Sequence, residues 1–176
     1  MIIKQHAFIK IKLSQSRYKK GYFYVSLVFD ELQEIEAMDF RYFVDDGEVF
    51  TPTKIGFRVK KELFDLFLPG ILKDSTGINI ACCKDGNQEL HIRHVIDSYG
   101  EGVDVRYFVS SDNYSGWSGK GVRFLVEDYK ILQQEIQLFV DSGFNYLAGS
   151  DLFREKEINI NKGKVKKSNP EKIFKF

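Results

Sequence analysis

The sequence predicts an α+β protein built from two tandem units, each with four β-strands followed by one α-helix. Three observations predict this class. The chain has 176 residues, of which 43% are apolar and 15% aromatic, with only three prolines; this composition can form a packed core and is typical of β-rich domains. Apolar residues alternate with a period of two in several segments and change to a helical period twice. The segment DFRYFV at 39–44 recurs as DVRYFV at 104–109.

The repeat sets the domain organisation. When the sequence is shifted by 65 positions, eight residues meet identical residues within about thirty ungapped positions. These residues are Asp39, Arg41, Tyr42, Phe43, Val44, Gly56, Arg58 and Glu62. We therefore divide the chain into a first unit at 1–73, a second unit at 74–149 and a tail at 150–176. The tail is polar and basic, so we expect it to be flexible.

The first unit is predicted to begin with two strands, at 7–13 and 22–30, joined by a polar turn. An acidic loop at 31–37 leads to a third strand at 38–44, and the DDG at 45–47 is typical of a hairpin turn. A fourth strand is predicted at 55–60. The helix is expected to begin near Lys60 and to end at Pro69–Gly70, because proline and glycine interrupt helices.

The second unit repeats this order. Strands are predicted at 78–82, 89–96, 103–109 and 121–126. The helix is expected to begin near Glu127 and Asp128, where acidic side chains suit the positive end of the helix dipole. Its apolar stripe comprises Tyr129, Leu132, Ile136, Phe139 and Val140. Gly143 is a typical end signal.

The chain carries no motif of a known catalytic or cofactor site: it has no phosphate loop and no GxGxxG, GxSxG or HExxH sequence. Cys82 and Cys83 are adjacent, and successive side chains of a strand point to opposite faces, so we expect both thiols to be structural. The three histidines lack metal-ligand spacing. We therefore expect no enzymatic activity, no cofactor and no bound metal.

Strand alternation places cations and aromatics on the face that the helices do not cover. In the first unit this face is expected to carry Lys10, Lys12, Tyr22, Tyr24, Ser26, Arg41, Phe43, Arg58 and Lys60. In the second it is expected to carry His91, Arg93, Arg106, Phe108 and Arg123, with Trp117 and Lys120 in the approaching loop. Single-stranded nucleic acid binds such surfaces, since bases stack on aromatic rings and cations hold phosphates. The alternative interpretation is that the aromatics serve strand pairing or contact another protein.

The ordered elements of both units resemble the single-stranded-DNA-binding domain of the positive-cofactor-four transcriptional coactivators. In that family a strand with an Arg-x-aromatic pattern leads through a loop to a Lys-Gly step, a further strand and a helix with an early aromatic. The first copy is carried by Arg41, Phe43, Thr51, Pro52, Thr53, Lys54, Gly56, Phe57, Arg58, Val59, Glu62 and Phe64. The second is carried by Arg106, Phe108, Trp117, Lys120, Gly121, Arg123, Glu127 and Tyr129. The resemblance covers about 7–73 and 77–140.

This resemblance implies that each unit is a curved antiparallel sheet backed by its helix. Family members with one unit form homodimers through their helices and bind single strands across the paired sheets. The Whirly proteins, which fuse two units in one chain, are also single-strand binders. The chain is therefore expected to form a pseudo-dimer by itself, and further self-association stays open.

We predict a protein that binds single-stranded DNA with little sequence preference, in transcription, replication, recombination or repair. RNA is an alternative ligand, and a protein-interaction or assembly module is an alternative function. No stretch approaches ~18 consecutive apolar residues and lysines interrupt the N-terminal apolar run, so we expect no membrane span and no signal peptide. The expected location is cytoplasmic, or nucleoid-associated in a bacterium or phage. The candidate binding residues are Lys10, Lys12, Tyr22, Tyr24, Arg41, Phe43, Lys54, Arg58, Arg93, Arg106, Phe108, Trp117, Lys120 and Arg123.

Overall fold

A computed structural model describes residues 2–74, 79–143, 155–159 and 165–166 of the chain. The first half contributes four strands, β1 (Ile2–Ile11), β2 (Gly21–Phe29), β3 (Ile35–Asp45) and β4 (Val49–Lys60). They are followed by a 3-10 turn at Lys61–Leu63 and by helix α1 (Phe64–Leu72). The second half contributes β5 (Asn79–Asp85), β6 (Gln88–Asp97), β7 (Gly100–Ser110), β8 (Ser115–Leu125) and helix α2 (Val126–Asp141). The prediction of an α+β protein with two successive sets of four strands and a helix is confirmed.

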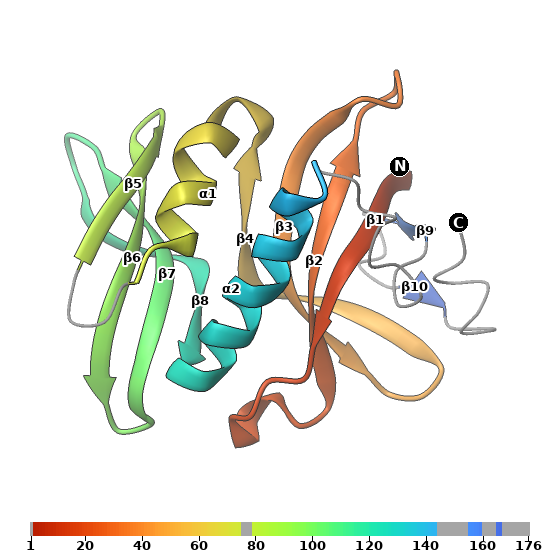
Figure 1. Cartoon of the computed structure of the whole chain (residues 1–176), viewed down its shortest axis with the longest axis horizontal. Helices are drawn as coiled ribbons and strands as arrows, with labels where there is room; N and C mark the ends of the chain where they lie inside the picture. Colours follow the sequence, from red (N-terminus) through yellow and green to blue (C-terminus); the bar gives the residue numbers. More distant parts are fainter. Residues whose placement is uncertain (1, 75–78, 144–154, 160–164, 167–176) are drawn as a thin grey trace.

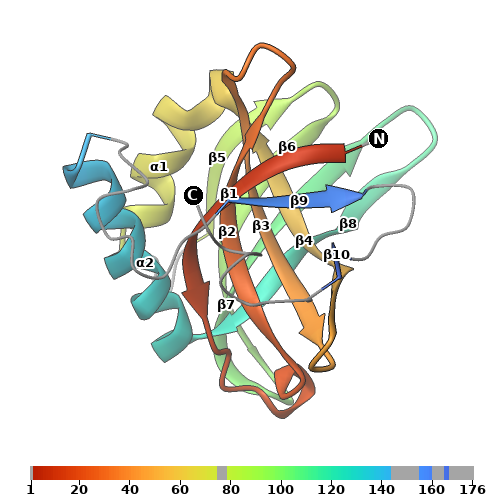
Figure 2. The same ribbon diagram turned by 90° about the vertical axis from the view of Figure 1, so that its right-hand side faces the viewer.

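The strands form one antiparallel sheet in the order β5-β6-β7-β8-β4-β3-β2-β1. Both helices lie on the same side of this sheet (Figures 1 and 2). Within each half the strands follow chain order, so each neighbouring pair is a hairpin or a short connection. No helix in the described part of the chain is long and apolar enough to cross a membrane.

The two halves meet where β4 pairs with β8. The backbone pairing between these strands joins Gly56 to Gly121. A Cβ atom at Gly56 would lie 2.4 Å from the carbonyl oxygen of Phe40, and one at Gly121 would lie 2.6 Å from that of Val105. Neither position leaves room for a side chain without moving the neighbouring strand. Glycine at these two positions therefore allows β4 to lie close to β3, and β8 close to β7, beside the junction of the halves.

The core lies between the sheet and the two helices. Phe40 and Phe57 stack in neighbouring strands with ring centroids 4.6 Å apart, and Phe67 of α1 packs on both of them. Phe124 of β8 packs against Phe23 of β2 with centroids 5.1 Å apart, so the core is continuous across the junction of the halves. The α2 residues Tyr129, Leu132, Ile136 and Phe139 are buried, as their spacing predicts.

The tail is only partly what the sequence predicts. Residues 150–176 were expected to be flexible, but two of their segments are strands: β9 (Glu155–Asn159) and β10 (Val165–Lys166). β9 pairs with β1, and β10 pairs with the start of β4 (Figure 2). The tail thus pairs with both outer strands of the first half, β1 and β4. The remaining tail residues lie outside the described part.

Several element boundaries also differ from the sequence prediction. The segment 48–54, expected to be a connection, belongs to β4 from Val49 onward, and the expected loop at 116–120 belongs to β8. In both cases turn-forming residues, Pro52 in β4 and Gly116 and Gly119 in β8, are accommodated beside a bulge in the neighbouring strand pairing. Helix α1 continues through Pro69 to Leu72, because Ile71 in its last turn is fully buried.

The Gly56–Gly121 junction gives the first testable prediction. Replacing Gly56 by alanine should lower the free energy of unfolding by about 1–3 kcal/mol, because the added Cβ meets the backbone oxygen of Phe40. Urea denaturation followed by circular dichroism measures this. Gly119→Ala is the matched control, since a Cβ there meets nothing within 4 Å. An equal stability of the two variants would contradict the role of the junction.

Candidate nucleic-acid interface

A single row of paired residues crosses the face of the sheet that the helices leave uncovered, which we call the helix-free face. The row passes from β1 to β5 through the junction of the two halves. It consists of Lys10, Tyr24, Arg41, Gly56, Gly121, Arg106, His91 and Ala81. Two arginines therefore flank the two glycines at the centre of this face. Their sequence pattern, Arg-x-Phe in both units, predicts this placement.

A buried carboxylate positions the cations of the first half. Asp39 is 1% exposed and accepts hydrogen bonds from Arg41 Nε at 3.2 Å and Nη2 at 3.1 Å. Arg58 of the neighbouring strand donates its Nε to the same carboxylate at 3.2 Å. Arg41 also donates to the carbonyl oxygen of Thr53 at 2.8 Å. Two guanidinium groups share one carboxylate, so this cluster keeps a net positive charge.

The second half contains a matching cluster around Asp104, which is 4% exposed. Arg106 donates Nε and Nη2 to Asp104 at 3.1 and 3.2 Å, and Arg93 donates Nη2 at 2.7 Å. Arg106 also donates to the carbonyl oxygen of Ser118 at 3.0 Å. The side chains of Arg93 and Arg106 remain about a quarter exposed. Fixed, partly exposed guanidinium groups of this kind can bind phosphate oxygens.

The second half also presents an open aromatic cluster. Trp117 of β8 is 37% exposed, and the guanidinium carbon of Arg93 lies 3.7 Å from its ring centroid. Phe108 and His91 contact the indole edge to face, with centroids 4.9 and 5.1 Å away. His91 Nε2 lies 2.8 Å from a carboxylate oxygen of Glu89. The cluster holds the indole in place while leaving part of it accessible.

Two of the aromatics predicted to stack on bases are buried instead. Tyr24 and Phe43 are each 1% exposed, and their rings pack edge to face at 5.4 Å. Phe50 packs on Tyr24 at 6.1 Å and is also buried. Strand alternation correctly predicts the side of the sheet on which these rings lie, but it does not predict that they are buried there. Neither ring is therefore accessible to a base, and the predicted stacking role of Tyr24 and Phe43 is wrong.

The remaining predicted residues of the first unit lie on more open parts of the face. Lys10 Nζ lies 4.1 Å and Lys12 Nζ 4.9 Å from the ring centroid of Tyr22, which is half-buried beneath them. Lys12 also donates to the carbonyl oxygen of Gly21 at 2.8 Å. Lys54 is exposed on β4. These positions carry accessible positive charge, but the Tyr22 ring is covered by lysines.

Arg123 is not an open cation of the second half. It is 6% exposed and donates Nε and Nη2 to Asp97, both at 2.7 Å. It also donates to the carbonyl oxygen of Gly100 at 2.6 Å. The hydrogen bonds from Arg123 hold the pKa of Asp97 below its usual range. Its predicted role in phosphate binding is therefore wrong, because the side chain is buried and its Nε and Nη2 donors are used within the fold.

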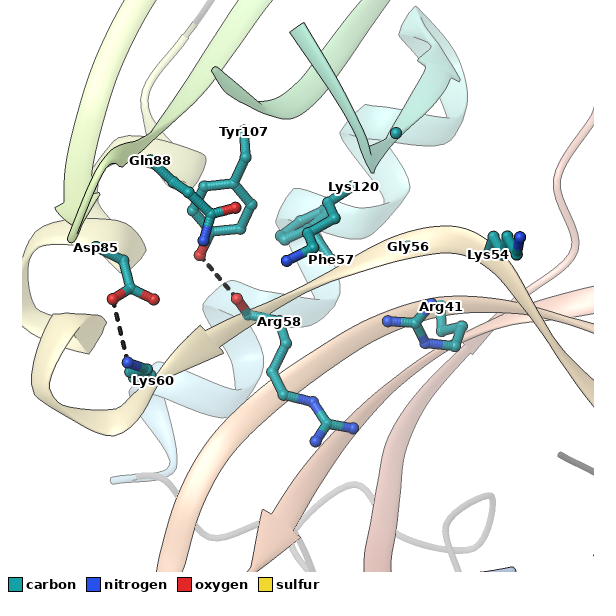
Figure 3. Close-up of a pocket in the computed structure, with 11 residues that line it drawn as sticks. Arg41, Lys54, Gly56, Phe57, Arg58, Lys60, Asp85, Gln88, Tyr107 and Lys120 are labelled. Atoms are coloured by element: carbon teal, nitrogen blue, oxygen red, sulfur yellow. Dashed lines mark hydrogen bonds and ion pairs between the residues drawn. The ribbon is translucent and has the colours of Figure 1, made fainter. Parts of the chain in front are cut away.

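A pocket of about 550 Å³ opens beside the junction of the halves (Figure 3). The predicted residues Arg41, Lys54, Arg58 and Lys120 line it. The set of binding residues predicted from the sequence lacks seven others that also line it: Gly56, Phe57, Lys60, Asp85, Gln88, Tyr107 and Gly119. Lys60 follows Arg58 at strand spacing, so the period of two was a usable signal for it. Asp85, Gln88, Tyr107 and Gly119 come from strands of the second half that the primary sequence does not place next to β4.

The adjacent cysteines also depart from the prediction. A register shift in the β5–β6 pairing lies at Cys82, so the two side chains do not simply alternate. The sulfur atoms of Cys82 and Cys83 lie 3.9 Å apart, and both residues are free thiols. Within the described residues, no group of three histidine, cysteine, aspartate or glutamate side chains is placed to hold a metal ion.

The Asp104 cluster gives the second prediction. Asp104→Asn should lower the free energy of unfolding by about 2 kcal/mol, because two neighbouring guanidinium groups lose their buried carboxylate. Chemical denaturation near neutral pH measures the loss. Asp85→Asn, which removes the partner of the exposed Lys60, should cost less than ~1 kcal/mol. Similar costs at both positions would show that Asp104 does not organise the arginines.

Comparison with known proteins does not assign a function to the helix-free face. No protein-family model matches the sequence, and no curated protein matches it. The resemblance to the positive-cofactor-four domain therefore depends on the quoted residues of the two units. The function of this face is inferred from the contacts, charge and exposure of its own residues.

Proposed function

We propose that this protein binds single-stranded DNA through the open part of its helix-free face, with little sequence preference. The observation that carries the proposal is the Trp117 cluster: an exposed indole fixed by Arg93, with a second aromatic, Phe108, beside it. An accessible aromatic surface among cations is what unpaired bases and their phosphates require. Stacking uses the flat face that every base shares, which gives affinity without selecting a sequence.

The cations around this cluster define a path for the phosphates. Arg93 and Arg106 lie beside Trp117 and Phe108, and Arg41 and Arg58 continue the same face across the junction. Lys54 and Lys120 are exposed along this path. The buried carboxylates Asp39 and Asp104 hold the four arginines and remove only part of their charge. We infer that the strand runs from the Trp117 cluster toward the first half, where bases cannot enter because Tyr24 and Phe43 are covered.

We further propose that the two halves are copies of one unit arranged as a pseudo-dimer. The proposal is supported by the position of the repeat at the junction, since Gly56 and Gly121 are equivalent residues and pair with each other antiparallel. Such a pairing of equivalent positions is expected of a two-fold axis. The clusters around Asp39 and Asp104 also use equivalent residues, Arg41 and Arg106.

The biological setting consistent with this activity is transcription, replication, recombination or repair. RNA is the alternative ligand, because stacking and phosphate contacts are available on both nucleic acids. Competition between the two nucleic acids for the protein distinguishes them.

The third prediction tests the binding surface. Wild-type protein should bind a fluorescently labelled oligo-dT of ~30 nucleotides, and Trp117→Ala should weaken binding about tenfold, because one stacking contact is lost. Fluorescence anisotropy measures both affinities. The affinity should also fall steeply between about 50 and 200 mM salt, as it does when phosphates are bound by lysine and arginine.

The control variant is Leu138→Ala, which removes an exposed side chain on α2, away from the sheet face. It should bind as tightly as the wild type. Duplex DNA should not displace the labelled strand, whereas displacement by single-stranded RNA at lower concentrations than oligo-dT would assign RNA as the preferred ligand. No binding at low salt would contradict the proposal and favour a protein-interaction module.

A further inference from the structure

The pocket beside the Gly56–Gly121 junction differs chemically from the open face around Trp117. It lies between the last residues of β4 and the strands of the second half, with Phe57, Arg58 and Lys60 on one side and Gln88, Tyr107 and Lys120 on the other (Figure 3). The Tyr107 hydroxyl donates to the carbonyl oxygen of Arg58 at 2.8 Å and closes its base. This hydrogen bond joins β7 to β4 where the backbone pairing of β4 with β8 has ended.

The equivalent space on the other side of the junction is filled. There the connection between β1 and β2 inserts Gln15 and Tyr18, which are 6% and 1% exposed. Gln15 Nε2 donates at 3.1 Å to the carbonyl oxygen of Arg123, the repeat equivalent of Arg58. Tyr18 packs at 4.9 Å on Tyr42, the equivalent of Tyr107. The pocket therefore exists because the turn between β5 and β6 is too short to insert such a plug.

Positive charge dominates the walls of this pocket. Its lining includes five cationic side chains and a single carboxylate, Asp85, which lies 3.1 Å from Lys60 Nζ. Arg41 and Arg58 are held by Asp39. Lys54 and Lys120 are exposed and have no ion-pair partner among the described residues. A ligand with one or more negative charges is what this wall would bind.

The floor and the size of the pocket restrict the ligand further. The buried rings of Phe57 and Tyr107 lie at the bottom of the pocket, and Gly119, where a Cβ would meet nothing within 4 Å, leaves the space above them open. The amide of Gln88 can donate and accept a hydrogen bond and has no side-chain partner within the described residues. A volume of about 550 Å³ is much larger than a phosphate ion needs and lies within the usual range for small organic ligands.

We propose that this pocket binds a nucleoside phosphate, with the phosphate on Lys120 and the base beside the amide of Gln88. The ligand is either a free nucleotide or one nucleotide of a bound single strand. The site uses neither Trp117 nor the other residues of the open aromatic cluster. Binding at the pocket can therefore be tested independently of the proposed single-strand surface.

The fourth prediction is tested by isothermal titration calorimetry of the whole chain with dTMP, thymidine and inorganic phosphate. Binding of dTMP is expected at one site per chain, with thymidine and phosphate each at least ~10-fold weaker, because each makes only part of the contacts. Lys120→Gln should weaken dTMP about tenfold through loss of a charge-assisted hydrogen bond. Lys130→Gln, which removes an exposed lysine of α2, should leave dTMP binding unchanged.

A second pair of variants tests the pocket without changing its charge. Gly119→Leu should abolish dTMP binding by filling the pocket, since a Cβ at this position meets open space. Gln88→Ala should weaken dTMP and serves as the test if the leucine variant does not fold. Equal dTMP binding by wild type, Gly119→Leu and Gln88→Ala would overturn the proposal, as would no binding of dTMP to the wild type.

Competition between oligo-dT and dTMP distinguishes the two sources of the nucleotide. If saturating oligo-dT displaces dTMP, the pocket holds a nucleotide of the bound strand; if both bind together, it is a site for free nucleotide. Trp117→Ala separates this inference from the proposed function. That variant should lose affinity for oligo-dT and still bind dTMP, and dTMP binding by a protein that fails to bind oligo-dT would support the pocket alone.

Discussion

The backbone pair between Gly56 and Gly121 is the contact on which the rest of the structure depends. It joins β4 to β8 and so makes one sheet from two sets of four strands. Glycine is required at both positions, because a Cβ at Gly56 would meet a backbone oxygen of β3 and a Cβ at Gly121 would meet a backbone oxygen of β7. With the strands joined there, both helices share one side of the sheet. Arg41 and Arg106 lie at the centre of the opposite face, next to the two glycines. The separation of β4 from the second half beyond this pair creates the space that Tyr107 bridges.

The two faces of the sheet differ in how their charge and apolar surface are balanced. The helix side is a continuous aromatic and aliphatic core. The other side buries two carboxylates, each hydrogen-bonded to two arginines, which satisfies the charge of the carboxylates and leaves the guanidinium groups partly exposed. In the first half this side is closed over Tyr24 and Phe43, whereas in the second half Trp117 remains accessible. The proposed strand-binding surface and the proposed nucleotide pocket both arise from this asymmetry between halves with the same sequence pattern.

Much of the fold could be predicted because it depends on local patterns. Period-two alternation correctly assigns the core face of Phe23, Phe40 and Phe57, and the repeat correctly predicts two sets of four strands and a helix. What could not be predicted depends on long-range contacts. Whether Tyr24 is exposed depends on its packing against Phe43 and Phe50 of other strands, and whether Arg123 is free depends on Asp97, 26 residues before it. The pocket could not be predicted from the sequence either. It exists because the turn between β5 and β6 is shorter than the equivalent connection between β1 and β2. The buried partners Asp39 and Asp104 were visible as repeated acids, but nothing in the spacing shows that each would hold two arginines.

The most direct test of the central claim, that the open helix-free face binds single-stranded nucleic acid, is photocrosslinking with an oligo-dT that contains 5-iodouracil. Mass spectrometry then identifies the crosslinked residues. We expect crosslinks at Trp117 and Phe108, since these aromatics would contact the bases, and none on the exposed surfaces of α1 and α2. Crosslinks confined to the helices, or an absence of crosslinks at low salt, would contradict the account.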